Sequence, residues 1–397
     1  MDVLRFLTTF KNRFLFLVQW RGGCSMENVL SKEPVLINGI GTVGSRTAHL
    51  LLSMNIPIHG VKASASKDDL KTQDLLVLYR RFGAFPLRVV PGDNYDERVK
   101  QFKQLGFEVI NQPIRYSIIV DATDGDVTAK NVVAYSAEQR FLVQGGTDFA
   151  LVRNDFVSAP HTVGEQLKNF HRARQVSCNT TFCSTALGQV LHHVRPEDIA
   201  AVDVELHRRC RDPGEKKEFR EALELKPSHH AQDVMNVMPR LAGKITSKAN
   251  INAWEHFHHT QLLISFTRAA DARIIARQLK SYPRCIVVEP ELTENPRDGM
   301  KTLMAVSAAL RVPDADCLLP VYSVHQVSKK SIMIRGFTPQ RSVIALSCSD
   351  WALGALGMSS WEKAFAYTNM YARWHGYPIA ELKKAYEENV RVKVAAV

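Results

Sequence analysis

Cys178 is the residue of this sequence that is best placed for covalent chemistry. It lies in the segment VSCNTT at residues 176–181, with apolar residues before it and a helical pattern from 185 to 190. The sequence therefore predicts that Cys178 begins a helix, where backbone amides and the helix dipole favour a thiolate and can hold an oxyanion. Cysteines are more often small buried side chains, and we expect that role for Cys183 and Cys210.

A glycine-rich segment early in the chain predicts a dinucleotide site. The segment GIGTVG places Gly39, Gly41 and Gly44 directly after the apolar run 35–38 and before an amphipathic stretch at 46–52. In a strand–turn–helix unit, this turn lets amides and the helix dipole meet a pyrophosphate without Cβ atoms in the way. A purely structural turn is the alternative, and the flanking strand and helix favour the cofactor site.

The end of the second predicted strand, at 56–61, bears on the choice of cofactor. NAD-selective folds place an acidic residue there, on the ribose 2′-hydroxyl. This chain has Lys62 instead, and no acid before Asp68. A cation at this place would accept a 2′-phosphate, so we expect NADP to be used well. A solvated loop with equal use of NAD is the alternative, and the expected cofactor is NADP or NAD.

Two sheets are needed to position these residues. Short apolar runs at 117–120 and 141–143 alternate with helical stretches and end in polar or glycine-rich segments, which predicts a Rossmann-like parallel sheet. After Cys178, longer β-rich runs predict a catalytic α+β domain with a mostly antiparallel sheet; the runs are 201–206, 261–266 and 285–288. The fold class is α/β, and residues 361–397 predict a helix interrupted at 376–378.

The same patterns predict the domain organisation. The expected parts are an N-terminal extension at 1–33, a dinucleotide-binding domain at 34–177, a catalytic domain at 178–327, and a segment at 328–397 that returns to the first domain. Met26 stands shortly before the first strand, so residues 1–25 are interpreted as the product of an upstream start codon. A basic targeting presequence is the alternative.

Seven ordered motifs resemble those of the archaeal-type (type II) glyceraldehyde-3-phosphate dehydrogenases. SCNTT at 177–181 is similar to that family's nucleophile motif. The other six are NGIGTVG at 38–44, VDAT with AKN at 120–131, QGG at 144–146, RR with DP at 208–213, SHH with Asp at 228–233, and HQ at 325–326. The resemblance covers about residues 34 to 345.

The resemblance implies a role for each matching residue. Cys178 would be the nucleophile, with the base in an H-x-H strand, where His256 is the first choice and His258 the second. Residues expected against the substrate or its phosphate are Ser177, Asn179, Arg208, His229 and His230. Residues expected against the nicotinamide cofactor are Thr42, Val43, Gly146, Arg209 and Gln326. The resemblance also implies a homotetramer.

Some residues depart from the family pattern around the expected site. Ala231-Gln232 replaces Gly-Pro after the histidine pair, Trp254-Glu255 replaces Leu-Met, and Val327 replaces a Glu. Phe182-Cys183 changes the wall near the thiol. The substrate is therefore expected to be glyceraldehyde 3-phosphate or another phosphorylated or acidic aldehyde, such as erythrose 4-phosphate or a semialdehyde.

The composition bears on the partners, the metal or disulfide content and the location to be expected of this protein. The net charge is +11, with 51 basic and 40 acidic residues, and the basic residues are scattered without interleaved aromatics, which argues against nucleic acid as the main partner. Seven cysteines without a CxxC pair argue against a disulfide framework or structural zinc. No apolar run approaches the ~20 residues that a membrane span needs, so a cytoplasmic protein without membrane contact is expected. Five histidines, at 229, 230, 256, 258 and 259, make a transition-metal site the alternative to a metal-free one.

The predicted reaction is the reversible phosphorylating oxidation of glyceraldehyde 3-phosphate to 1,3-bisphosphoglycerate. A thiolate forms a hemithioacetal, a base takes its hydroxyl proton, and the nicotinamide receives the hydride. Inorganic phosphate then cleaves the thioester, so arginines and histidines would serve two anions. The alternative from another class is a non-catalytic nucleotide-sensing or nucleic-acid-binding protein that has kept the fold.

Overall fold

The computed structural model describes most of the chain. The described residues are 33–62, 95–107, 109, 115–123, 125–144, 152, 154–162, 171–210, 222–223, 227–254, 256–311, 319–358, 360–374 and 377–395. Residues 1–25, interpreted above as the product of an upstream start codon, lie outside them, as does Gly146, and for Thr42 only the backbone is described. No helix within these ranges is both long enough and apolar enough to cross a membrane.

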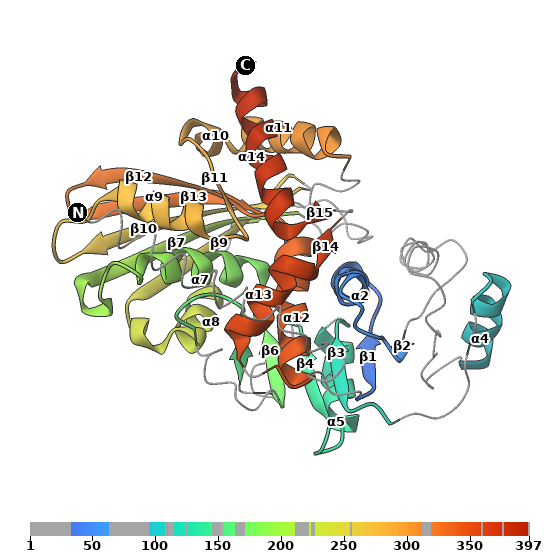
Figure 1. Ribbon diagram of the computed structural model, residues 1–397. Coiled ribbons are helices and arrows are strands. Elements are labelled where there is room, and N and C mark those ends of the chain that lie inside the picture. Colours follow the sequence, from blue (N-terminus) through green and yellow to red (C-terminus); the bar gives the residue numbers. More distant parts are fainter. Residues whose placement is uncertain are drawn as a thin grey trace, which may run out of the picture.

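The first sheet has six strands, all parallel (Figure 1). Its spatial order is β2-β1-β3-β4-β6-β5. The strands are β1 (Val35–Asn38), β2 (Gly60–Lys62), β3 (Ile118–Asp121), β4 (Arg140–Val143), β5 (Asp155–Phe156) and β6 (Arg172–Gln175). Because parallel strands all end at the same edge, the loops after β1, β3, β4 and β6 meet there, which is where ligands bind in such sheets.

The second sheet has seven strands in the order β11-β12-β13-β10-β7-β9-β8. Its strands are β7 (Ile199–Arg209), β8 (Ala222–Leu223), β9 (Ile245–Asn252), β10 (His258–Phe266), β11 (Ile286–Val287), β12 (Val321–Ser328) and β13 (Ser331–Thr338). Four of the six pairings are antiparallel, and β7–β9 and β11–β12 are parallel. The predicted fold class, a Rossmann-like parallel sheet with a mostly antiparallel second sheet, is confirmed.

Helices α7 (Cys178–Val190), α8 (His230–Val237) and α9 (Ala272–Ser281) cover one face of the second sheet. The side chains beneath them alternate along the strands, as Val202, Val204 and Leu206 do in β7. The remaining helices are α2 (Thr42–Ser53), α4 (Tyr95–Gln104), α5 (Gly125–Ala134), α10 (Glu291–Glu294), α11 (Pro296–Ala309), α12 (Gln340–Ala355), α13 (Trp361–Tyr371) and α14 (Ile379–Ala395). Short elements are the 3-10 helices Pro196–Asp198 and Pro239–Leu241, with the β14 (Arg373–Trp374) and β15 (Tyr377–Pro378) hairpin.

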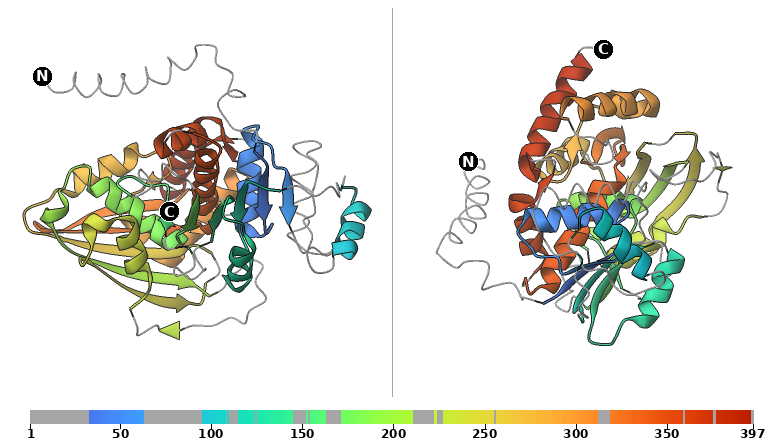
Figure 2. Two further views of the ribbon diagram at one scale, coloured as in Figure 1. Left: turned by 90° about the horizontal axis from the view of Figure 1, so that it is seen from below. Right: turned by 90° about the vertical axis from the view of Figure 1, so that its right-hand side faces the viewer.

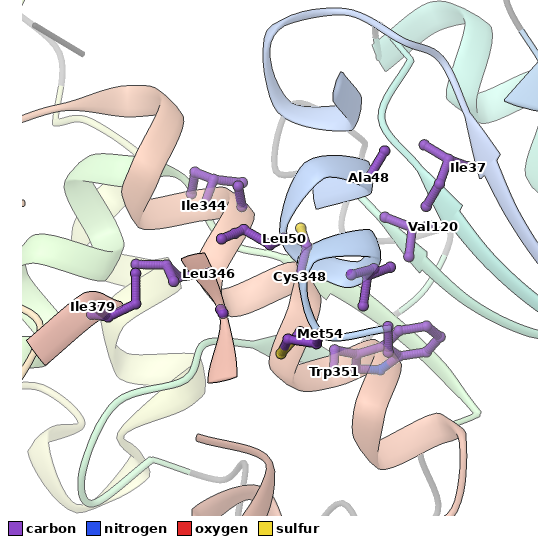
Figure 3. Close-up of a cluster of buried hydrophobic side chains, with 14 of the residues drawn as sticks. Ile37, Ala48, Leu50, Met54, Val120, Ile344, Leu346, Cys348, Trp351 and Ile379 are labelled. Carbon is purple, nitrogen blue, oxygen red and sulfur yellow. The ribbon is translucent and has the colours of Figure 1, made fainter. Parts of the chain in front are cut away.

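The chain returns to the first sheet after β13. Helix α12 packs against α2, β3 and β4, and Figure 1 shows it beside the strands of the first sheet. Figure 3 shows Ile344, Cys348 and Trp351 of α12 facing the side of α2 that carries Leu50 and Met54. The proposed domain boundaries stay a prediction, and β13 pairs within the second sheet although it follows residue 328.

One connection brings both sheets to the same place. Strand β6 leads through residues 176–177 into α7, so the start of α7 lies at the carboxyl edge of the first sheet. Helix α7 then runs along the second sheet, and β7 comes back antiparallel to the helix after the short turn at 191–198. Figure 2 shows the two sheets from two further directions. The beginning of α7 and the end of β7 therefore lie at the same end of the second sheet.

Candidate functional site

Cys178 is the first residue of α7, as the sequence predicts. The helix is capped by Ser177, whose Oγ accepts a hydrogen bond from the Thr180 amide at 3.2 Å, and the Ser177 carbonyl accepts one from the Thr181 amide at 2.8 Å. The thiol is 6% exposed. A capped helix start of this kind directs its dipole and first amides toward a group at the thiol.

Asn179, which follows the thiol, has an unusual polar environment. Its side chain is 2% exposed, and its Oδ1 has no hydrogen-bond partner in the described part of the chain. A buried amide oxygen left without a partner is costly unless a ligand or water satisfies it. Asn179 therefore offers an acceptor beside Cys178, in keeping with the expected position of the substrate.

The glycine turn has the shape that a dinucleotide phosphate requires. Gly39 has φ +87°, and a Cβ on it would lie 2.9 Å from the Thr123 side chain. A Cβ on Gly44 would lie 1.8 Å from the Gly39 carbonyl oxygen, so α2 can approach β1 only with glycine there. Gly41 is the N-cap residue of α2, and Thr42 and Val43 begin the helix. The turn and the start of α2 thus have the arrangement expected of a pyrophosphate site, and that role stays a prediction.

Lys62 lies next to this turn, at the end of β2. Its carbonyl accepts a hydrogen bond from the Gly39 amide at 2.7 Å. This is the neighbouring strand end that meets the adenosine ribose in dinucleotide-binding folds. The position of Lys62 is therefore compatible with the expected contact to a 2′-phosphate.

A buried carboxylate, that of Asp121, supports the glycine turn. The sequence alone did not indicate a role for it. Asp121, at the end of β3, accepts hydrogen bonds from Thr123 Oγ1 at 2.6 Å, Tyr135 Oη at 2.6 Å, and Asn38 Nδ2 at 3.2 Å. Burial and the nearby Asp121 raise the pKa of Tyr135 far above its usual range. The network fixes Thr123, which forms the wall against Gly39.

Arg208 and Arg209 point to opposite faces of the second sheet. Arg208 follows Leu206 by two residues and so shares the helix-covered face. His258 lies two residues before Thr260 and four before Leu262, on that same face. Arg209 pairs with Asn252 on the opposite face and is 4% exposed. The structure thus brings Arg208 and His258 toward α7 and α8, whereas the expected cofactor contact of Arg209 stays a prediction.

The histidine pair lies at the start of α8 above that face. The rings of His229 and His230 stack with centroids 4.1 Å apart, and His230 Nδ1 lies 3.1 Å from Ser228 Oγ. Burial lowers the pKa of His230 well below its usual range, and the charges of His229, Arg208 and His258 lower it further. His230 is therefore a neutral group, and the same interactions show that the four side chains form one cluster.

The two candidate bases, His256 and His258, lie in different local environments. Strand β10 begins at His258 and Phe257 before it has φ +51°, so His256 lies outside the strand. His258 is 6% exposed and its Nδ1 accepts a hydrogen bond from the Arg209 amide at 3.3 Å. In a neutral ring this acceptor places the proton on Nε2, which makes His258 a donor. His256 is half-buried in the bend before the strand.

Gln326 lies at the far end of the second sheet, near the β12–β13 turn. Its Oε1 accepts a hydrogen bond from the Ala272 amide at 2.8 Å, and its Nε2 donates to the Ala270 carbonyl at 3.1 Å. The amide thus joins the hairpin to the start of α9. Cys178 lies toward the other end of the sheet, so the structure does not place Gln326 beside the thiol. The expected contact of Gln326 with the cofactor stays a prediction.

A buried ionic network beneath the histidine pair was not assigned a role from the sequence. Arg174 of β6 binds Asp155 and Asp233, and all three side chains are nearly inaccessible. Alternation along β6 gives no signal for this role, because Arg172 is exposed whereas Ala173, Arg174 and Gln175 are all buried. Among the described residues, no group of three or more His, Cys, Asp or Glu side chains is arranged to hold a metal ion.

The chain is similar in sequence to proteins named glyceraldehyde-3-phosphate dehydrogenase. No model of a known family matches the chain. The glyceraldehyde-3-phosphate dehydrogenase of Aeropyrum pernix is 27% identical over 326 residues, 79% of this chain and 90% of that protein. The enzyme of the same name from Methanobrevibacter smithii is 28% identical over 65% of this chain and 74% of its own length. These likenesses confirm the resemblance that the seven motifs predict.

Solved structures of similar shape support the fold. Aspartate semialdehyde dehydrogenase II from Vibrio cholerae has a TM-score of 0.56 at 11% identity, covering 81% of this chain and 98% of that one. A probable aspartate-semialdehyde dehydrogenase from Pseudomonas aeruginosa has a TM-score of 0.55 at 10% identity, with the same coverage. At such identities the likeness shows a common fold.

Proposed function

We propose that this chain is an NAD(P)-dependent aldehyde dehydrogenase that oxidises glyceraldehyde 3-phosphate to 1,3-bisphosphoglycerate, using inorganic phosphate. The observation that carries the proposal is the position of Cys178. The thiol lies at a capped helix N-terminus where the carboxyl edge of a parallel sheet meets the end of the second sheet that carries Arg208 and His258. Similarity to glyceraldehyde-3-phosphate dehydrogenases over most of the chain supports the same substrate.

The residues present fit a nicotinamide dinucleotide. The glycine turn cannot accept a Cβ at Gly39 or Gly44, and the start of α2 provides amides for the pyrophosphate. Lys62 at the end of β2 favours NADP, with NAD as an accepted alternative. When bound, the nicotinamide accepts the hydride that leaves C1 of the substrate.

The side chains of the site divide the remaining chemistry. The Cys178 thiolate attacks the aldehyde carbon, and the amides at the start of α7 hold the resulting oxyanion before it is protonated to the hemithioacetal. We assign His256 as the base that takes this hydroxyl proton back as the hydride departs, because Nδ1 of His258 is engaged as an acceptor. Inorganic phosphate then attacks the thioester carbonyl, which releases 1,3-bisphosphoglycerate and regenerates the thiolate.

In this proposal the cluster of Arg208, His229 and His230 binds the substrate phosphate. Arg208, His229 and a neutral His230 are assigned to the substrate phosphate, and Asn179 offers its unpartnered oxygen to a substrate hydroxyl. A homotetramer and a cytoplasmic location are part of the proposal, supported by the resemblance. Other phosphorylated or acidic aldehydes are the alternative substrates because Phe182 and the residues after His230 depart from the family pattern.

The first test is reduction of NADP and NAD at 340 nm with glyceraldehyde 3-phosphate, with and without inorganic phosphate. Wild type should turn over only with phosphate, and Cys178→Ser should lose at least a thousandfold in kcat. Cys183→Ser is the matched control, because burial raises the pKa of Cys183 to about 12 and makes this thiol of the same helix inert. Control activity should stay within twofold of wild type.

Three results would contradict the proposal. No turnover with either cofactor would exclude this substrate, and a panel with erythrose 4-phosphate and aspartate semialdehyde would then identify the aldehyde. Turnover that is independent of phosphate would exclude the phosphorolytic step. Equal loss in both cysteine variants would exclude Cys178 as the specific nucleophile.

A further inference from the structure

The buried ionic network joins the strand that precedes the nucleophile to the helix that carries the histidine pair. Arg174 Nε donates to Asp155 Oδ1 at 2.6 Å and Nη2 donates to Asp155 Oδ2 at 2.9 Å, so one carboxylate already binds this guanidinium with both oxygens. Nη2 also donates to Asp233 Oδ1 at 2.6 Å. The side chains of Arg174, Asp155 and Asp233 are 6%, 0% and 5% exposed.

Two carboxylates share this network, and burial raises the pKa of Asp233 against the opposing effects of Arg174 and His229. One guanidinium is buried with two carboxylates, and the neutral Asn236 supplies only a further donor to Asp155, at 3.0 Å. A buried carboxylate oxygen without a hydrogen bond is unfavourable, so a polar neighbour is expected close by. Among the described residues, the group that faces the free oxygen of Asp233 is His229, with Nε2 3.7 Å from Oδ2.

The two oxygens of Asp233 therefore have separate partners. Oδ1 is bound to Arg174, whereas Oδ2 is buried without a hydrogen bond among the described groups and faces the His229 ring. The His229 ring lies beside this oxygen, and His230 stacks against the same ring. A role limited to neutralising Arg174 would not need Asp233, because Asp155 already does so.

The same network is coupled to the nucleophile through the backbone. Arg174 lies four residues before Cys178, and the chain between them is fixed by the Val176 amide, which donates to the Phe156 carbonyl at 3.1 Å. Asp233 lies one helical turn after His229 on α8. Arg174 thus holds the start of α7 and the start of α8 at a defined separation.

We propose that Asp233 is a positioning residue of the anion site: it orients His229 toward the substrate phosphate, at a separation from Cys178 that Arg174 fixes. The inference rests on the proposed function, because it explains how the same site binds its anion. Asp233 itself touches neither substrate nor thiol.

The test uses phosphate binding rather than turnover. Iodoacetamide alkylation of Cys178, followed by mass spectrometry of the peptide that contains it, is measured at increasing inorganic phosphate. Asp233→Asn should raise the phosphate concentration for half-protection at least fivefold, with the alkylation rate in the absence of phosphate within twofold of wild type. Asp233→Glu should restore part of the protection. Met304→Ala, an exposed position on α11 away from this network, should behave as wild type.

A double-mutant cycle separates positioning from general support. If Asp233 acts through His229, Asp233→Asn should change half-protection less than twofold in a His229→Gln background. An equal effect in both backgrounds would overturn the proposal. So would unchanged protection in Asp233→Asn, with or without a lower melting temperature, because the carboxylate would then be structural only.

Failure of the proposed function would look different. If wild type oxidises no aldehyde but Asp233→Asn still weakens phosphate protection, the substrate assignment is wrong and the positioning role stands. If wild type turns over glyceraldehyde 3-phosphate but phosphate protection is unaffected by Asp233→Asn, the dehydrogenase assignment stands and the positioning role is excluded.

Discussion

At the scale of single residues, the histidines of the second sheet differ because they lie at different depths. Burial lowers the pKa of His259 to about 4, opposed by its hydrogen bond to the Thr293 carbonyl and reinforced by the charges of His207 and Arg335. His207 and His325 are less buried, and burial lowers the pKa of each to a smaller extent. His259 is therefore neutral in the folded protein near neutral pH and titrates only in acid.

The low pKa of His259 predicts that the protein loses stability in acid, and that a substitution at this one position reduces the loss. Below pH 6.5 the unfolded chain protonates His259 and the folded chain does not, so stability falls as pH drops from about 6.5 towards 4, by a total on the order of 3 kcal/mol. His259→Gln keeps a donor for the Thr293 carbonyl and should reduce the loss of urea midpoint between pH 7 and pH 5. An equal loss in the variant and wild type would contradict the assignment.

The candidate site was predictable only where a local pattern specified it. The start of α7 at Cys178 and the glycine turn follow from short segments, and both are as expected. The faces of Arg208 and Arg209 depend on which side of the sheet the helices cover, which is a tertiary property. The positive φ of Phe257 and the pairing of Arg174 with Asp233 likewise arise from contacts distant in sequence.

At the scale of elements, the strands and helices with clear periodicity were foreseen and the short ones were not. The strand expected at 56–61 is limited to Gly60–Lys62 in the structure, and the two-residue β5 and the helix α8 have no strong signal of their own. Such elements form because neighbours supply their hydrogen bonds and packing. Among the described strands, for example, β5 has β6 as its single partner.

Two glycines with the same backbone angle allow the glycine turn to be tested. Gly39 and Gly106 both have φ +87°, but a Cβ would meet Thr123 and Ala122 at Gly39 and nothing within 4 Å at Gly106. Gly106→Ala should cost only the left-handed backbone penalty of about 1 kcal/mol, with unchanged cofactor affinity. Gly39→Ala should also raise the Kd for NADP at least tenfold by fluorescence titration. Similar Kd values for both variants would show that the turn does not shape the cofactor site.

At the scale of the whole molecule, a second buried ion pair connects α12 to the segment that precedes β11 of the second sheet. Arg284 donates to both oxygens of Asp350, at 2.6 and 2.9 Å, and its guanidinium lies 4.1 Å from the centre of the Phe365 ring. Arg284 also binds Asn369 of α13. Ser158, which follows β5, donates to the same carboxylate. One arginine thus joins α12 and α13 to the segment before β11.

Removing one partner of this pair should be strongly destabilising. Arg284→Met leaves a buried carboxylate and should lower the free energy of unfolding by about 3 to 5 kcal/mol, whereas Arg284→Met with Asp350→Leu should lose less than the single variant. Arg273→Met, which breaks an exposed pair with Asp271, should change the urea midpoint little. A double variant that is less stable than Arg284→Met would contradict this account.

The return of α12 also has a consequence during protein synthesis. The ribosome makes the strands of the first sheet early, but the helix that covers Leu50 and Met54 begins only at Gln340. Until then the nascent chain carries an apolar surface without its cover, although the sheet's hydrogen bonds can already form. Exposed apolar surface of this kind invites aggregation and chaperone binding. Translation that stalls between β13 and α12 would therefore release a chain with a formed sheet and an unprotected face.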